Sequence, residues 1–190
     1  SKAGMGTTCT AVLLIGHNKG ILAHVGDSRL YVARGGSIYQ LSDDHTYVNE
    51  LIKRGAITKE QAKNHPQSNV LSRAMGVQPS VPVDSMIFDI DPGDTYLLCT
   101  DGLHNYFPDC NELIFGIDNN MTIWIELLIK TALDRGGHDN ITVVSFRRTD
   151  ELTEPEKTVP NIQGRIIILK QIPIFQHLTY NELTKVLGLT

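Results

Sequence analysis

The sequence lacks the features that would place it in a membrane or on a nucleic acid. Its longest apolar runs, such as Thr10–Ile15 and Ile166–Leu169, fall far short of the ~20 residues that a membrane-spanning helix needs. It has no excess of basic charge either, because 17 Lys and Arg residues face 21 Asp and Glu residues and the formal net charge is −4. We therefore expect neither a membrane nor a nucleic acid as the main partner.

Cysteine is scarce, and no signal-peptide pattern is visible at the start. Cys9, Cys99 and Cys110 form no C-x-x-C pair, which argues against a disulfide framework or a zinc knuckle and favours a reducing, cytoplasmic compartment. Residues 1–4 contain no Met and neither the basic nor the apolar segment of a signal peptide. Strand-like sequence begins by Thr7, so we expect the chain to start within a domain.

The first part of the sequence contains short strand-like segments separated by glycine-rich turns. β-Branched and apolar residues favour strands, whereas Gly with Asn, Asp or Ser favours tight turns. Turns this short connect antiparallel neighbours. The pattern predicts an antiparallel sheet with strands at Thr7–Ile15, Ile21–Val25, Arg29–Ala33 and Ile38–Leu41.

The apolar period then changes from that of strands to that of helices. It predicts a helix over 47–52, and the capping box formed by Thr58 and Gln61 predicts a second, short helix. The segment 69–84 is irregular and polar. We expect these elements to form a mobile flap.

Two aspartates stand at the ends of later strand-like segments. Asp101 follows the apolar run Tyr96–Cys99, and Asp139 precedes the run Ile141–Phe146, with an amphipathic helix expected between them at Met121–Leu133. Carboxylates at strand ends can face each other across a sheet and bind a hard metal ion. The alternative is ordinary turn chemistry, in which each aspartate bonds to its own backbone.

The composition changes after Arg147. Residues 149–161 are acidic, contain proline and have few apolar side chains, which is typical of a linker. Residues 162–190 are too few to bury a core alone. We therefore assign residues 1–148 to one domain and interpret residues 162–190 as the start of a second.

Six short motifs follow one another along the first domain. They are Gly4-Met5-Gly6-Thr7-Thr8, Gly26-Asp27-Ser28-Arg29, Leu41-Ser42-Asp43-Asp44-His45-Thr46, Leu71-Ser72-Arg73-Ala74-Met75-Gly76, Cys99-Thr100-Asp101-Gly102-Leu103 and Gly137-His138-Asp139-Asn140-Ile141-Thr142. Each alone is a weak signal. In this order and spacing they closely resemble the metal-dependent serine/threonine protein phosphatases of type 2C, in their bacterial form.

The resemblance implies a fold, a reaction and a set of partners. The fold is α+β, a four-layer α-β-β-α sandwich of two antiparallel sheets flanked by helices, of which residues 1–148 would be the C-terminal two-thirds, incomplete at the N-terminus. The reaction is hydrolysis of phosphoserine and phosphothreonine on proteins by a water that two Mn²⁺ or Mg²⁺ ions activate, with a third, weaker ion in bacterial members. The partners are a phosphorylated protein substrate and a Ser/Thr kinase or its targets.

The resemblance also assigns roles to individual residues. Asp101 and Asp139 match ligands of the two-metal core and are the expected catalytic residues. Asp27 matches the aspartate that holds the third ion together with Asp101. Gly102 and Asn140 are expected to shape the site, since glycine lets the chain pass close to it.

Other polar residues of the motifs fit more than one role. For Arg29, pairing with a neighbouring carboxylate and contact with the substrate phosphate both remain open. Residues 46–76 match the flap of the family, which lies beside the cleft and affects substrate choice. His24, His45 and His138 lack the spacing of metal ligands, so we expect them to pack or to cap.

The sequence departs from the family on one half of the metal site. The family has an acidic residue on its first strand, an Asp-Gly-x-Gly-Gly turn and a phosphate-binding arginine upstream, and this chain contains none of them. Asp101 and Asp139 alone would bind two dications weakly. We therefore expect little phosphatase activity from the chain by itself and interpret it as part of an enzyme.

Two other functions stay open. One is a non-catalytic, phosphatase-like regulatory domain, although mutual repulsion among Asp27, Asp101 and Asp139 argues against it. The other is the output domain of a cyclic-nucleotide sensor, because residues 169–183 are similar to the entry helices of cyclic-nucleotide-binding domains. A generic capped helix explains that last motif equally well.

Overall fold

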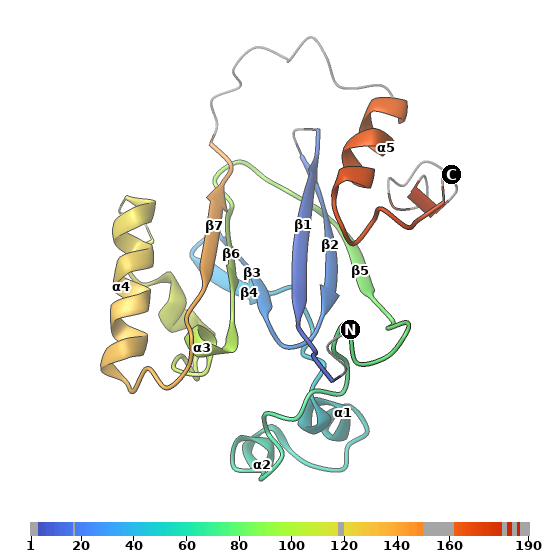
Figure 1. The fold of residues 1–190 in the computed structure, drawn as a ribbon. Coiled ribbons are helices and arrows are strands. Elements are labelled where there is room, and N and C mark those ends of the chain that lie inside the picture. Colours follow the sequence, from blue (N-terminus) through green and yellow to red (C-terminus); the bar gives the residue numbers. More distant parts are fainter. Residues whose placement is uncertain are drawn as a thin grey trace. The chain divides into compact units, whose positions relative to one another are not determined.

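The computed structural model describes residues 4–16, 18–117, 120–149, 162–179, 182–183 and 186 (Figure 1). The chain forms two compact units, Ser1–Asp150 and Glu151–Thr190, and each is described by itself. Beyond residue 149, the predicted linker 149–161 lies outside the described residues. All the predicted site residues belong to the first unit.

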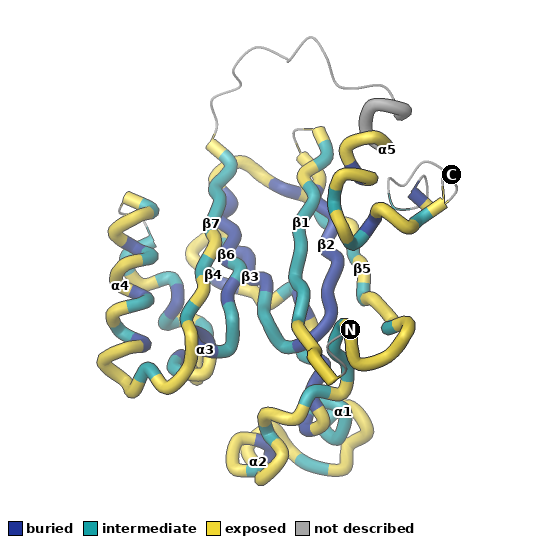
Figure 2. The backbone as a smooth tube through the Cα atoms, in the orientation of Figure 1, coloured by how far each residue is buried: buried dark blue, intermediate teal, exposed yellow. Residues whose placement is uncertain are grey.

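Two antiparallel sheets form the framework of the first unit. One has the strand order β1 (Cys9–Ile15), β2 (Lys19–Val25), β5 (Asp84–Asp89), and the other has the order β4 (Ser37–Gln40), β3 (Arg29–Arg34), β6 (Thr95–Cys99), β7 (Val143–Arg147). The expected α+β fold of two antiparallel sheets with flanking helices is confirmed. β2 is buried along almost its whole length (Figure 2).

The first four strands do not form the single sheet that their short turns predicted. β1 and β2 form a hairpin in one sheet, whereas β3 and β4 form a hairpin in the other. The change of sheet occurs at Gly26, whose φ of +112° is unfavourable for other residues and whose added Cβ would lie 2.3 Å from Thr8 Cγ2. Glycine therefore permits this corner, and the corner carries Asp27.

Side chains alternate along the strands and pack on both faces of the four-stranded sheet. Between the two sheets, the ring of Tyr96 stacks on Phe146 with 4.7 Å between centroids. On the other face, the buried Trp124 donates from Nε1 to the Leu113 carbonyl at 2.8 Å. The buried residues of the two cores are, between the sheets, Leu22, Leu30, Val32, Ile90 and Tyr96, and, beneath the helices, Tyr31, Ile38, Leu97, Cys99, Leu103, Phe107, Leu113, Trp124, Leu128 and Ala132.

Helices cover one face of the framework and one of its ends. α3 (Asp101–His104), the 3-10 helix η1 (Cys110–Ile114) and α4 (Met121–Asp134) cover the outer face of the four-stranded sheet. α1 (Tyr47–Lys53) and α2 (Lys59–Lys63) lie beyond the ends of β1 and β2 (Figure 1).

The segment predicted to be a flap contains the two predicted helices and is anchored at several points. Thr46 caps α1 by accepting from the Asn49 amide at 3.3 Å, and α2 opens with the predicted capping box. After α2, paired backbone hydrogen bonds of 3.0 and 2.8 Å join Thr7 to Met75. The irregular part of the segment is therefore attached to the residues just before β1.

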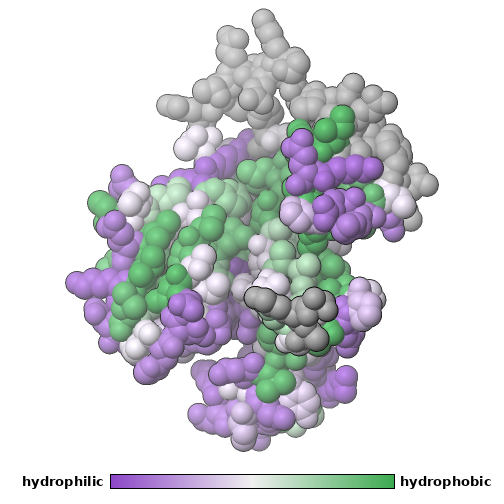
Figure 3. Space-filling model, viewed as in Figure 1, coloured by the Kyte–Doolittle hydropathy of each residue, from purple (hydrophilic) through white to green (hydrophobic). Residues whose placement is uncertain are grey.

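Both sheets end in an edge strand with exposed apolar side chains. Among the described strands, β1 pairs only with β2, and β7 pairs only with β6. Leu14 of β1 is 53% exposed and Val144 of β7 is 55% exposed. Figure 3 shows apolar surface over α4 and β7.

The second unit contains one longer helix, α5 (Ile162–Gln171). Further along, Thr179 and Glu182 form reciprocal capping bonds, in which the Thr179 amide donates to Glu182 Oε2 at 2.7 Å and the Glu182 amide donates to Thr179 Oγ1 at 3.4 Å. No helix in the described part of the chain has the length and apolar character required to cross a membrane.

Candidate functional site

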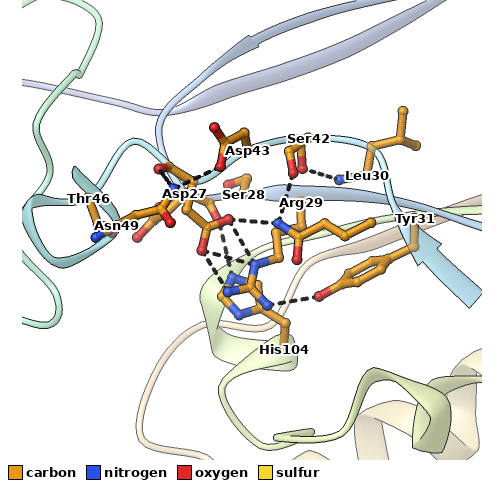
Figure 4. Close-up of polar contacts among 12 residues, drawn as sticks. Asp27, Ser28, Arg29, Leu30, Tyr31, Ser42, Asp43, Thr46, Asn49 and His104 are labelled. Atoms are coloured by element: carbon orange, nitrogen blue, oxygen red, sulfur yellow. Dashed lines mark hydrogen bonds and ion pairs between the residues drawn. The ribbon is translucent and has the colours of Figure 1, made fainter. Parts of the chain in front are cut away.

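Asp27 lies at the corner between the two sheets, after β2 and before β3. Its backbone is fixed from two sides. The Gly26 carbonyl accepts from the His45 amide at 2.7 Å, and the Asp27 carbonyl lies 3.0 Å from Nε2 of His104. The corner therefore presents a partly buried carboxylate on a rigid support (Figure 4).

Asp101 stands where β6 passes into α3. Its Oδ1 accepts from the Gly102 amide at 2.9 Å, which is the local bonding expected of a turn aspartate. The next residue, Gly102, is buried against the loop that precedes β7. A Cβ added to it would lie 2.3 Å from the backbone oxygen of Asn140 and 2.9 Å from the backbone carbon of the same residue. Only glycine lets the two loops approach this closely.

Asp139 lies in the loop between α4 and β7, and it is exposed. Its Oδ1 accepts from the Asn140 amide at 2.7 Å. Thr100 connects this loop to the end of β6, since its Oγ1 donates to the Asn140 carbonyl at 3.2 Å and accepts from the Thr142 amide at 3.0 Å. The antiparallel pairing of β6 with β7 thus brings the Asp101 and Asp139 segments to the same end of the four-stranded sheet.

The surroundings of Asp27 disfavour the charged form of its carboxylate. Burial, followed by the charges of Asp101 and Asp44, raises the pKa of Asp27 from 3.8 to about 6, and Arg29 opposes the rise only in part. Asp27 and Asp101 therefore lie close enough to repel each other, a situation that a bound cation relieves. Within the described ranges, however, no group of three or more His, Cys, Asp or Glu side chains is placed to hold a metal ion.

Arg29 is committed to a neighbouring carboxylate. Its Nε donates to Asp44 Oδ1 at 2.9 Å and its Nη2 donates to Asp44 Oδ2 at 2.6 Å, while Nη1 donates to the Tyr31 hydroxyl at 3.0 Å (Figure 4). Burial works to lower the pKa of Arg29, but the hydrogen bonds and charge of Asp44 outweigh it and raise the pKa. The sequence left open whether Arg29 pairs with a carboxylate or contacts the substrate phosphate. In the structure, Arg29 pairs with the carboxylate of Asp44.

His104 is a residue of this site that the sequence analysis did not single out. Because the Asp27 carbonyl can only accept, His104 Nε2 carries the hydrogen. The buried Nδ1 has no hydrogen-bond partner among the residues that the structure describes. Burial, with a smaller contribution from Arg29, lowers the pKa of His104 to about 4. The signal for this residue was its place on α3, three positions after Asp101, where a helical turn brings side chains to one face.

Two further histidines, His24 and His45, pack next to the corner that carries Asp27. The Gly26 amide donates to His45 Nδ1 at 3.1 Å, so His45 Nε2 carries the hydrogen that faces Asp84 Oδ2 at 3.0 Å. Arg73, near the end of the flap segment, donates to Asp84 Oδ1 at 2.6 Å. The rings of His24 and His45 are both buried and 4.8 Å apart. These contacts are packing and capping contacts, the kind expected for His24 and His45.

A cavity of about 540 Å³ opens beside the corner. Asp27, Arg29 and His104 line one side of it. The flap helices line another side, with Val48 and Ile52 from α1 and with Ala62 from α2. Of the three candidate carboxylates, Asp27 borders this space, which has the size that proteins use to bind small ligands and side chains, whereas Asp101 and Asp139 are not among its lining residues.

Comparisons with known proteins connect this geometry to a family. Residues 3–121 match the family described as protein phosphatase 2C. The serine/threonine phosphatase stp of Listeria welshimeri is 40% identical over 146 residues, which cover 76% of this chain and 58% of that protein. The protein phosphatase PhpP of Streptococcus pneumoniae is 38% identical over 153 residues, covering 80% of this chain and 61% of that protein.

Solved structures agree with the sequence relatives. The serine/threonine phosphatase PstP/Ppp of Mycobacterium tuberculosis superposes with a TM-score of 0.70 at 38% identity, covering 76% of this chain and 61% of that chain. The catalytic domain of PstP in complex with two manganese ions superposes with a TM-score of 0.66 at 37% identity, over 75% of this chain and 58% of that chain. The present chain thus spans less than two thirds of the length of these relatives. On the match of residues 3–121 and on the shared fold, the chain belongs to the protein phosphatase 2C family.

Proposed function

We propose that this chain supplies one side of the active site of a metal-dependent phosphatase that hydrolyses phosphoserine and phosphothreonine on proteins. The observation that carries the proposal is the partly buried Asp27 carboxylate at the corner between the sheets, whose pKa is raised to about 6 by burial first and then by the charges of Asp101 and Asp44. A carboxylate pair held in this way by rigid strand ends suits a hard divalent cation. The phosphatase names of the relatives at about 40% identity and the manganese ions of the PstP complex favour the same chemistry.

The proposal assigns metal binding to Asp27, Asp101 and Asp139. Mn²⁺ or Mg²⁺ bound there would supply a water of lowered pKa and neutralise phosphate oxygens during in-line attack. Gly102 allows the Asp101 and Asp139 loops to lie against each other, and Asn140 fixes the backbone next to Asp139.

The chain's other polar groups position this set. Thr100 holds the loop that carries Asp139 to the end of β6. His104 donates to the Asp27 backbone carbonyl, so the Asp27 carboxylate stays available for a metal ion. Arg29 neutralises Asp44, so that the remaining negative charge near the cavity belongs mainly to the proposed ligands. None of these three side chains needs to touch the substrate.

Two ions need more ligands than three carboxylates provide. Each Mg²⁺ or Mn²⁺ takes about six oxygen ligands, of which waters and substrate oxygens supply several. The proposal assigns the remaining protein ligands to sequence outside this chain, and it treats residues 1–148 as the C-terminal two-thirds of the catalytic domain. The greater length of the relatives is compatible with this assignment.

The proposal for the tail is that residues 162–190 begin a second domain. The capping bonds between Thr179 and Glu182 fit an entry helix of a cyclic-nucleotide-binding domain, and they fit any capped helix as well. Equilibrium dialysis of the longest product of the reading frame that contains the chain against cyclic AMP and cyclic GMP separates the two interpretations.

Phosphate release from a phosphothreonine peptide tests the proposed reaction. The assay uses the chain and the longest product of the reading frame that contains it, each with and without Mn²⁺. We expect Mn²⁺-dependent release by the longer product, loss of it in Asp101→Asn, and retention in Asp134→Asn, which changes an exposed aspartate at the end of α4. Equal release by the wild type and Asp101→Asn would contradict the proposed role of Asp101, and no Mn²⁺-dependent release by the longer product would contradict the proposal and favour a regulatory domain without catalysis.

A further inference from the structure

The cavity beside Asp27 has a wall that the proposed reaction does not use. That wall is α2, which contributes Lys59, Ala62 and Lys63 to the lining. The apolar side chains of Val48, Ile52, Ala62 and Phe107 also line the cavity. An aliphatic stem with a polar end, such as that of a glutamate, would therefore find both apolar and charged surface here.

The two lysines form a positive edge. Lys59 and Lys63 are separated by one helical turn, so they lie on the same face of α2, and both are exposed. In the described part of the chain, neither forms an ion pair with an acidic side chain. Lys53 of the neighbouring helix α1 is different, because it pairs with Asp43. Backbone and Thr58 hydrogen bonds, followed by the charges of Lys63 and Lys59, lower the pKa of the neighbouring Glu60. No ion pair among the described residues commits either lysine to that carboxylate, so their charge is available to a ligand.

The opposite wall does not cancel this charge. Asp44 also lines the cavity, but Arg29 neutralises it through a two-pronged contact at 2.9 and 2.6 Å. Asp27 lines it too, and the proposed function assigns that carboxylate to a metal ion. The cavity is therefore positive on the α2 side, while Asp27, the one proposed metal ligand among its lining residues, lies on the other side.

We propose that the cavity between α2 and the Asp27 corner is a subsite for an acidic side chain of the substrate protein, next to the phosphorylated serine or threonine. The inference rests on the proposed function and specifies its substrate class as phosphorylated sites in acidic surroundings. Lys59 and Lys63 contact the carboxylate of the substrate, and the apolar side chains from α1 and α2 contact its stem. They are specificity residues and take no part in phosphate hydrolysis.

Fluorescence anisotropy with paired peptides measures this preference without hydrolysis. The probes are labelled phosphothreonine peptides that carry Glu, or Gln at the same positions, on either side of the phosphothreonine, and the protein is the full chain. With two cation contacts we expect the Glu peptides to bind roughly three- to tenfold more tightly at low salt, and we expect salt to reduce the difference. Lys59→Glu/Lys63→Glu should reverse the order of the two peptides.

A charge reversal elsewhere provides the matched control. Lys130 is an exposed lysine of α4 that does not line the cavity, so Lys130→Glu should keep the wild-type preference. Circular dichroism melting of the variants checks folding, because substitutions of exposed lysines should shift Tm little. Equal affinity of the Glu and Gln peptides for the wild type, no binding of either, or an equal effect of Lys130→Glu would overturn the inference.

The proposed function and this inference fail in different ways. Mn²⁺-dependent hydrolysis without a preference for Glu peptides would contradict the acidic subsite and support the proposed phosphatase function. The opposite result is a preference for Glu that Lys59→Glu/Lys63→Glu reverses, together with no Mn²⁺-dependent hydrolysis by the longest gene product. It would support the acidic subsite and contradict the proposed phosphatase function.

Discussion

Replacing Gly102 by alanine should separate the two loops that carry Asp101 and Asp139. The added Cβ would lie 2.3 Å from the Asn140 backbone oxygen, whereas a carbon and an oxygen in ordinary contact are about 3.3 Å or more apart. One of the two loops must therefore move by about 1 Å. Because the obstacle is backbone, no change of rotamer can relieve the clash.

The cost of this movement can be worked out from the contacts around it. Overpacking of this kind costs about 1–3 kcal/mol. The movement also strains the bonds of Thr100 to the Asn140 carbonyl and the Thr142 amide, each worth about 1 kcal/mol. We expect a loss of about 2–4 kcal/mol in the free energy of unfolding, which for a unit of this size lowers Tm by roughly 5–15 °C.

Thermal unfolding followed by circular dichroism measures the change. Gly93→Ala is the control, because Gly93 has a φ of +85° with nothing within 4 Å of an added Cβ, so the variant has backbone strain of about 1 kcal/mol without a clash. The Mn²⁺-induced shift in Tm should also shrink in Gly102→Ala and persist in Gly93→Ala. If Gly102→Ala lowers Tm no more than Gly93→Ala does, the close approach of the two loops is refuted.

Three further perturbations test other parts of the account. Lowering the pH should destabilise the chain through His104, whose pKa of about 4 in the folded state lies below the usual 6.5. Because the unfolded state binds the proton first, the stability that is present above pH 6.5 is lost as the pH falls toward 4. Urea unfolding at pH 7 and pH 5 should therefore show a loss that is about 2 kcal/mol smaller in His104→Gln than in the wild type, and equal losses would contradict the buried neutral imidazole. Arg29→Lys replaces the two-pronged contact with Asp44 by a point charge and should cost about 1–2 kcal/mol in chemical denaturation; an unchanged midpoint would show that the pairing is not formed. Leu14→Lys and Val144→Lys place charges on the two edge strands and should reduce concentration-dependent association in sedimentation velocity, whereas wild-type chain that stays monomeric at all concentrations would argue against open edges.

The parts of the fold that depend on local sequence were predictable. The capping box of Thr58 and Gln61 placed α2, and glycine with aspartate marked the end of β6 at Asp101. The turn at 91–94 has the geometry that Pro followed by Gly favours, with a positive φ at Gly93 and the Asp94 amide bonded to the Asp91 carbonyl at 3.1 Å. Each of these signals lies within a few residues of the element it specifies.

The parts that depend on distant contacts were not predictable from local sequence. Nothing in the sequence near Gly26 indicates that β3 joins a second sheet, because that depends on contact with Thr8. His104 and Asp27 are 77 positions apart, and only the fold brings the imidazole to the Asp27 carbonyl. The role of Arg29 was left open for the same reason, since its partner Asp44 comes from the loop after β4.

Metal binding by the chain itself is the most direct test of the central claim. Tm is measured while Mn²⁺ is titrated, for the wild type, Asp101→Asn and the control Asp134→Asn. At ten times its Kd, a ligand that binds only the folded state stabilises it by about 1.4 kcal/mol, which is a rise of roughly 3–5 °C for a unit of this size. The account predicts a saturable rise in the wild type and in Asp134→Asn that Asp101→Asn abolishes. An unchanged Tm, or the same rise in Asp101→Asn, would contradict it.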